Sequence, residues 1–495
     1  MNATLAPARA ATGSTPAPAL AATATVVILA SIMTVLDTTI INVALERLTG
    51  AFDAPLATIA WVATGYTLAL ATVIPVTAWA MGRFGAKRLY LTAIALFAAG
   101  SLLAGLAWNA ESLIAFRVVQ GLGGGMIVPV GMAIMMRASD PARLGRTMAI
   151  MGIPVLIGPL AGPVLGGWLV DHASWRWIFF INLPIAAVAL CGAYRVLRTD
   201  TPQPGRALDV PGLLMLSPGL AALIYGVATG GERADFTTSA TLLPTLAGLA
   251  LIAGFVVRAL RSDHPLIDPA LFAHRQFRSG VLTLTLFSGA YFGSMLLGPL
   301  YWQVVRGASA TEAGGYGIPQ VLATGLTMQI AGRLADRIPP GRIVLTGIVT
   351  AATGFLAMTT QIQADTEYWR IAAAGVLMGI GVGATIMPTV ATASRGLPPA
   401  DIPAATTAIN IVQQVSASIG AAAVSVLLST ALVREAGATL DSVRAGTPQQ
   451  HAALADGLAD AFRGTYGWAV GVMALALLPA LLLARNAIGV SRTLS

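Results

Sequence analysis

Long apolar runs alternate with short polar and basic stretches along the whole chain. Fourteen of these runs have about the length, roughly 20 residues, that a helix needs to cross a bilayer. They cover residues 21–44, 58–79, 89–107, 112–136, 147–170, 175–197, 211–229, 240–257, 279–305, 313–330, 343–361, 369–392, 403–432 and 466–484. The pattern predicts an all-α polytopic membrane protein with fourteen transmembrane helices. The seventh and eighth runs are the shortest, and re-entrant segments are the alternative for these two.

Composition and charge support a membrane protein. Of the 495 residues, 56% are hydrophobic and 10% are charged, whereas soluble proteins average about 25% charged residues. If the N-terminus is cytoplasmic, cytoplasmic segments hold 20 Lys or Arg residues and outer segments hold 8, with Arg117 inside the fourth run. This bias predicts that both termini are cytoplasmic. The net charge of +8 therefore sets topology, and we expect no nucleic-acid partner. The preference for Arg over Lys is typical of a GC-rich bacterial genome, so we expect a bacterial inner membrane.

An internal repeat divides the chain. Residues 82–88 (GRFGAKR) follow the second run and residues 332–337 (GRLADR) follow the tenth. Two similar basic turns predict two six-helix halves in a parallel duplication, as is typical of transporters. We expect a disordered cytoplasmic tail at 1–20, an N-terminal half at 21–198, a linker with an inserted helix pair at 199–278, and a C-terminal half at 279–487. The C-terminal half would contain a polar, partly helical outer loop at 434–464, and residues 488–495 would be a cytoplasmic tail.

Asp37 lies inside the first apolar run. A carboxylate there costs roughly 2.5–3.5 kcal/mol on insertion scales and is a functional-site hypothesis by default. At 1.5 Å rise per residue, Asp37 lies about 12 Å and Arg117 about 8 Å from the outer ends of their helices. A nearby arginine favours the ionised carboxylate and burial favours the neutral acid. A motion that separates the two would change proton affinity; the alternative is a static ion pair.

Four segments resemble the major facilitator superfamily, and within it the fourteen-span drug:proton antiporters. They are residues 36–45 (LDTTIINVAL), 117–125 (RVVQGLGGG), the Gly/Pro run 152–167 and residues 175–184 (WRWIFFINLP). The resemblance implies neighbouring first and fourth helices, proton coupling through Asp37 and Arg117, and alternating access. It also implies gating by the fifth-helix motif, for which close packing alone is the alternative. The motif residues are Gly158, Pro159, Gly162, Pro163, Gly166 and Gly167.

The loop after the second run departs from the family pattern. The family usually has Gly-x-Leu-Ala-Asp-Arg-x-Gly-Arg, whereas Gly82 replaces the Asp here, with Arg83 and Gly85 retained. The second copy keeps Asp336 and Arg337. We therefore expect the carboxylate latch to be missing from the N-terminal half.

Polar and aromatic residues inside the runs are candidates for a substrate cavity. They are Thr38, Asn42, Tyr66, Gln120, Tyr291, Phe292, Asn410, Gln413 and Gln414. Aromatic rings could hold a cationic or aromatic ligand, and the alternative for all of them is helix packing or interhelical hydrogen bonding. Glu312 follows a helix-start pattern and is assigned to the helix start, not to ion coupling.

Several classes of enzyme and metal-binding protein are excluded because their motifs are missing. The single lysine, Lys87, is in no phosphate-binding loop, and no hydrolase signature occurs. The four histidines lie in loops, which argues against an intramembrane metal site. We expect no enzyme, cofactor or metal, and a proton gradient as the energy source. The expected function is proton-coupled export of lipophilic, cationic or amphipathic compounds, that is, multidrug efflux, by a protein for which a monomer suffices. A lipid or metabolite exporter and a transport-inactive scaffold or sensor are the alternatives.

Overall fold

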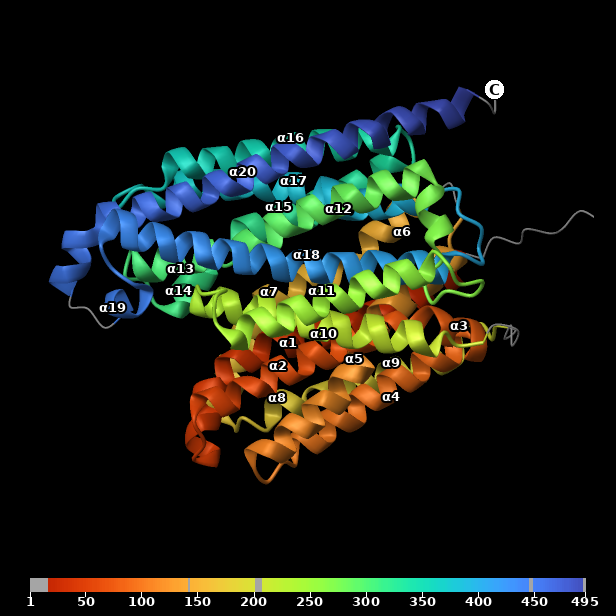
Figure 1. The fold of residues 1–495 in the computed structure, drawn as a ribbon, viewed down its shortest axis with the longest axis horizontal. Helices are drawn as coiled ribbons and strands as arrows, with labels where there is room; N and C mark the ends of the chain where they lie inside the picture. Colours follow the sequence, from red (N-terminus) through yellow and green to blue (C-terminus); the bar gives the residue numbers. More distant parts are fainter. Residues whose placement is uncertain (1–16, 141–142, 201–206, 445–447, 493–495) are drawn as a thin grey trace, which may run out of the picture.

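The computed structural model describes residues 17–140, 143–200, 207–444 and 448–492, and every element in these ranges is helical (Figure 1). Residues 1–16 of the predicted tail lie outside the described residues. Its last four residues, 17–20, belong to the first helix. The N-terminal helices are α1 (Ala17–Phe52), α2 (Leu56–Val73), η1 (Ile74–Val76), α3 (Thr77–Phe84), α4 (Ala86–Gly105), α5 (Ala110–Ala138), α6 (Leu144–Met151), α7 (Ile153–His172), α8 (Trp177–Phe180) and α9 (Asn182–Val196). We call them the N-terminal bundle.

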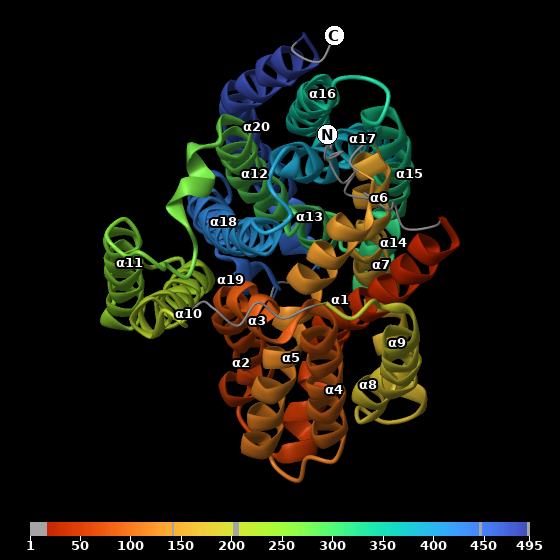
Figure 2. The same cartoon turned by 90° about the vertical axis from the view of Figure 1, so that its right-hand side faces the viewer.

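The remaining helices follow in chain order. First come α10 (Val210–Arg233), α11 (Ser239–Ala259) and η3 (Pro269–Ala273). The C-terminal bundle consists of α12 (Arg275–Ser294), α13 (Leu297–Val304), α14 (Ala310–Tyr316), α15 (Ile318–Ala335), α16 (Pro340–Gln361), α17 (Tyr368–Ser394), α18 (Ile402–Ala431), the π-turn η4 (Leu432–Ala436), α19 (Leu440–Arg444) and α20 (Pro448–Arg492). In Figure 2 most helices of each bundle form a group of their own, α6 lies beside α15 and α17 of the other bundle, and α10 and α11 lie at one side.

Twelve helical segments among the described residues are long and apolar enough to cross a membrane. The predicted fifth and tenth spans are not among these twelve, and each is divided into two helices. The breaks are at Gly152, between α6 and α7, and at Gly317, between α14 and α15. The sequence Gly-Ile-Pro occurs at both breaks, and a proline lacks the N–H that would continue the preceding helix. The two divided spans pack against each other between the bundles.

The seventh and eighth predicted spans are full-length helices. α10 has 24 residues and α11 has 21, and both qualify as candidate spans, which favours spanning helices over re-entrant segments. α10 packs against both α2 and α18, whereas α11 packs mainly on α10. The inserted pair is thus attached to both bundles through one helix.

Hydrogen bonds between the two bundles lie at one end of the molecule. We call it the basic end, because it carries Arg83, Lys87, Arg88, Arg143 and Arg146. Hydrogen bonds join the bundles there, from Gln329 Nε2 to Ala149 O at 2.9 Å and between the Thr77 and Thr407 hydroxyls at 2.8 Å.

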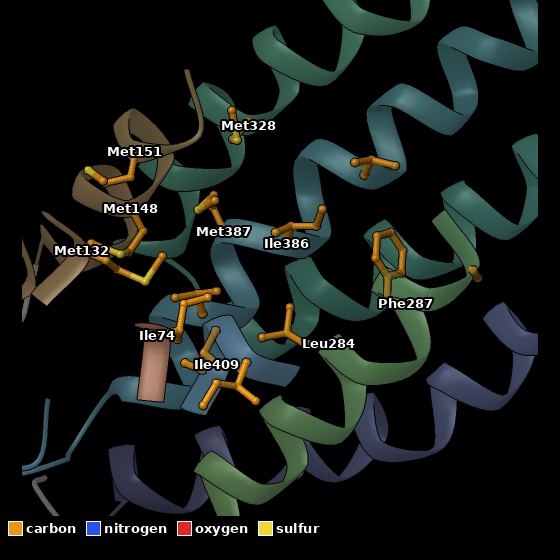
Figure 3. Packing of buried hydrophobic residues seen from close by; sticks show 14 of the residues in the cluster. Ile74, Met132, Met148, Met151, Leu284, Phe287, Met328, Ile386, Met387 and Ile409 are labelled. Carbon is orange, nitrogen blue, oxygen red and sulfur yellow. The ribbon is translucent and has the colours of Figure 1, made fainter. Parts of the chain in front are cut away.

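Methionines fill much of the contact between the bundles at the basic end. Figure 3 shows Met132, Met148 and Met151 of the N-terminal bundle near Met328 and Met387 of the C-terminal bundle, with the Met151 side chain turned away from Met328. All five are buried. Because methionine is unbranched and flexible, it repacks more readily than other apolar side chains. The contact between the bundles is therefore made largely by adaptable side chains.

The segment predicted as a partly helical outer loop, residues 434–464, contains η4, α19 and the first turns of α20 in the described residues. α20 then continues to Arg492, so most of the predicted tail at 488–495 is the end of this helix.

Candidate functional site

Asp37 and Arg117 form a buried ion pair between α1 and α5. Asp37 Oδ2 lies 2.5 Å from Arg117 Nη1, and the two side chains are 2% and 0% exposed. Arg117 also donates from Nε to the carbonyl oxygen of Val62 at 3.1 Å, and its guanidinium lies 4.1 Å from the centre of the Tyr66 ring. Two buried charges add little to stability unless they are well paired. Such a pair is more easily explained by a function than by folding.

Two amide side chains complete the surroundings of the carboxylate. Gln120 Nε2 and Asn182 Nδ2 both donate to Asp37 Oδ1, at 2.8 and 3.1 Å. Gln120 Oε1 also accepts from Arg117 Nη1 at 2.8 Å. Both amides donate to Ser101 Oγ as well, at 3.2 and 3.0 Å. The site therefore joins α1, α4, α5 and α9.

Sequence analysis missed Asn182 and Ser101 as site residues. Asn182 lies in a motif that we noted at 175–184, but it begins α9, a position where asparagine often has only a capping role. Ser101 carries no signal beyond being a hydroxyl in an apolar run. Both are buried, at 1% and 0% exposure.

Two polar atoms next to the pair are buried without a hydrogen bond among the described residues. They are Arg117 Nη2 and the Tyr66 hydroxyl. Buried polar groups almost always have partners, so these two atoms indicate that the site is not fully satisfied in this conformation. Chemically, Asp37 is the group that can take up a proton, because an arginine stays charged. Protonation would remove the charge that pairs with Arg117.

The glycines of α7 bring that helix close to the part of α1 that carries Asp37. A Cβ atom added at Gly158, Gly162 or Gly166 would meet Val35, Thr39 or Ile40 of α1, respectively. Thr39 Oγ1 also donates to the carbonyl oxygen of Gly158 at 3.1 Å. Close packing is thus present, and gating stays a prediction. Gly167 is half-buried, and the side chains of Pro159, Pro163 and Asn42 lie outside the described residues.

The other cavity candidates fall into two groups. Tyr66 and Gln120 belong to the Asp37 site, and Thr38 donates to Val35 O of its own helix at 2.7 Å. The rest lie on α12 and α18 of the other bundle, which pack together. They are half-buried: Tyr291, Phe292, Asn410, Gln413 and Gln414. The Tyr291 and Phe292 rings are 5.1 Å apart, and Asn410 Nδ2 donates to Thr406 O of its own helix at 2.8 Å. The structure does not bring this group to Asp37.

Asp336 joins the two bundles at the basic end. Its Oδ1 accepts from the backbone N–H of Gly145 at 3.0 Å, at the start of α6. Burial raises the pKa of Asp336, and the backbone N–H groups of Arg146 and Gly145 oppose that shift. Arg337, the next residue, is exposed. Glu312 has the expected helix-start role, since it forms a capping box with Ser309.

A carboxylate does lie at the first copy of the basic turn, which corrects our expectation. Asp200, from the segment after α9, accepts from Ala86 N at 2.8 Å, directly after Gly85, whose φ is +85°. It lies 3.9 Å from Arg137 Nη1, and Arg137 Nη2 donates to Pro399 O of the C-terminal bundle at 3.3 Å. The sequence pattern could not show this, because the carboxylate comes from a distant segment.

A cavity of about 330 Å³ lies beside this turn, and Gly82 and Arg83 are among its lining residues. Elsewhere, no three His, Cys, Asp or Glu side chains within the described ranges come close enough to hold a metal ion.

The helical bundles agree with what comparison with known proteins shows. The chain belongs to the Major Facilitator Superfamily, whose family model matches residues 27–421. It is therefore a multi-pass membrane transporter and not an enzyme. Within the superfamily it belongs to the multidrug efflux group.

Three curated relatives illustrate that group. The Multidrug resistance protein B homolog of Mycobacterium tuberculosis is 44% identical over 82% of this chain and 76% of its own length. The Multidrug export protein EmrB of Escherichia coli is 31% identical over 79% of this chain and 77% of its length. The Fatty acid resistance protein FarB of Neisseria gonorrhoeae is 29% identical over 81% of this chain and 79% of its own length.

Solved structures share the fold. The human organic anion transporter MFSD10 matches with a TM-score of 0.61 and 16% identity over 94% of this chain and 99% of its own. The proton:xylose symporter XylE matches with a TM-score of 0.56 and 13% identity over 92% of this chain and 95% of its own. At such low identity these likenesses concern the fold alone.

Proposed function

We propose that this protein exports lipophilic, cationic or amphipathic compounds across a bacterial inner membrane in exchange for protons. All fourteen predicted spans cross the membrane, including the two divided ones, and the two bundles are the moving halves. The basic end and both termini lie in the cytoplasm, as the distribution of Lys and Arg favours. Curated relatives at 31–44% identity that bear multidrug names support the substrate class.

The buried Asp37–Arg117 pair carries the proposal. In this proposal the basic end faces the cytoplasm, so a structure whose bundles are hydrogen-bonded to each other at that end represents the outward-facing state. A proton from outside that binds Asp37 cancels its attraction to Arg117 and weakens the hydrogen bonds from α5 and α9. The protonated and ionised forms thus favour different arrangements of the same four helices, which is what coupling requires. If the pair were only a static ion pair, the helices would keep one arrangement whether Asp37 is protonated or ionised.

Export of lipids or fatty acids is the second candidate function. The similarity to the Fatty acid resistance protein FarB favours it, and a substrate cavity that is mostly apolar with one acid would suit a lipid as well as a drug. A transport-inactive scaffold or sensor is disfavoured, because a scaffold has no need of a charge pair at 0–2% exposure.

Transport in proteoliposomes tests the proposal. An imposed pH gradient should drive the movement of ethidium by the wild type and not by Asp37→Asn, with Asp263→Asn, an exposed acid at the basic end, as the matched control. Oleate in the same assay separates the two substrate classes: movement of oleate without ethidium would establish the lipid exporter instead. Movement of neither compound, in well-folded protein, would contradict both.

A further inference from the structure

We propose that Asn182, held in place by Ser101, is a positioning residue that sets the pH at which Asp37 takes up its proton. This inference rests on the proposed proton coupling and names two residues that control it. The observation behind it is that a single carboxylate oxygen, Asp37 Oδ1, accepts from two amides on different helices, Gln120 on α5 and Asn182 on α9. Hydrogen bonds donated to a carboxylate favour its ionised form.

The two amides are held differently. Gln120 is fixed at both ends, because its Oε1 accepts from Arg117 while its Nε2 donates to Asp37. Both hydrogen bonds of Asn182 run from Nδ2, one to Asp37 Oδ1 at 3.1 Å and one to Ser101 Oγ at 3.0 Å. Ser101 is therefore the group that orients Asn182 toward the carboxylate. Its own hydroxyl donates to Phe179 O at 2.9 Å, which fixes the serine in turn.

This arrangement links proton uptake to helices other than those of the ion pair. Ser101 lies on α4 and Phe179 on α8, so the chain of hydrogen bonds runs from α1 through α9 and α4 to α8. When Asp37 is neutral, the bond from Asn182 loses its charge-assisted strength, which is roughly half of its energy. The contact that fastens α9 to α1 then weakens together with the ion pair to α5.

Few other ionisable groups lie close enough to Asp37 to influence its protonation. Arg117 and Tyr66 face Asp37. The other elements packed on α1 carry their described ionisable side chains toward their ends: Arg146 on α6, His172 on α7 and Cys191, Tyr194 and Arg195 on α9. α4 likewise carries Lys87, Arg88 and Tyr90 in its first turns. The amide of Asn182 is thus one of the few polar groups able to tune Asp37.

Infrared titration of the purified full-length protein tests the inference without any substrate. The C=O stretching band of protonated Asp37 is identified by its loss in Asp37→Asn, and its intensity is followed against pH. In Asn182→Leu, similar in size but without donors, the midpoint should move to higher pH by about one to two units, the equivalent of one hydrogen bond to a charged group. Ser101→Ala should give a smaller shift in the same direction, and Asn182→Gln should return the midpoint toward the wild-type value.

Ser294→Ala is the matched control, because Ser294 is equally buried but donates to Ala290 O of its own helix; its midpoint should equal that of the wild type. A wild-type midpoint in both Ser101→Ala and Asn182→Leu would overturn the inference. If Asn182→Leu does not fold, Asn182→Ala takes its place, because Ser101→Ala also removes a hydrogen bond from Gln120. Ethidium export is measured separately. If the midpoints shift but export is independent of the pH gradient, the proposed function fails while the positioning role stands.

Discussion

Removal of the Asp336 carboxylate should open the basic end. In Asp336→Ala the backbone N–H of Gly145, 3.0 Å from Oδ1, loses an acceptor that belongs to the other bundle. A hydrogen bond to a charged group contributes about 1.5–3 kcal/mol. Because Asp336 is only half-buried, solvent screening reduces this to about 1–2 kcal/mol. The ratio of closed to open basic ends should therefore fall about 5- to 30-fold.

Distances between spin labels measure this ratio. After the native Cys191 is replaced by serine, labels at exposed Arg88 on α4 and Arg342 on α16 report the separation of the bundles at the basic end. Asp336→Ala should enlarge the population at long distance. Asp336→Asn, which keeps an acceptor oxygen, should give an intermediate result.

The control is Asp263→Ala, which removes an exposed acid at the same end. Equal distance distributions in Asp336→Ala and Asp263→Ala would refute the reasoning. The basic turns at 82–88 and 332–337 would then only set the orientation of the chain in the membrane.

Three further variants extend the account. Gly82→Asp places a carboxylate where a Cβ atom meets nothing within 4 Å, and we expect the same labels to show more of the closed basic end; an unchanged or opened distribution would argue against a second latch. Gly162→Val forces a side chain against Thr39, and ethidium export should be lost in protein that still inserts, whereas Gly467→Val, with open space around it, should export normally. Arg117→Ala removes the ion partner of Asp37, and the infrared midpoint of Asp37 should move to higher pH; a fixed midpoint would show that the pair is not coupled.

The spans and the two charged residues of the ion pair could be predicted from the sequence, because each depends on a short stretch of the chain. The length of an apolar run predicts a span, and an acid inside such a run stands out by its cost. The depths of Asp37 and Arg117 along their helices follow from the rise per residue. Their contact required the first and fourth helices to be neighbours, which the family resemblance implied.

What the pattern could not show depends on how helices are rotated and which segments meet. Asn182 and Ser101 reach Asp37 because α9 and α4 present those faces to α1 and α5, and no local pattern encodes that rotation. Asp200 occupies the turn beside Gly85 although 114 positions separate it from Ala86. The divisions at Gly152 and Gly317 carried a signal, the repeated Gly-Ile-Pro, which hydropathy averages out.

Proton release on ligand binding tests the central claim most directly. The claim is that the protonated and ionised forms of Asp37 favour different arrangements of the helices, so that substrate binding and proton binding are coupled through Asp37. Purified protein in weakly buffered solution is mixed with ethidium while a pH indicator records protons. The account predicts release by the wild type and by Asp263→Asn, and none by Asp37→Asn, although each protein still binds the dye. Equal release by Asp37→Asn and the wild type would contradict it.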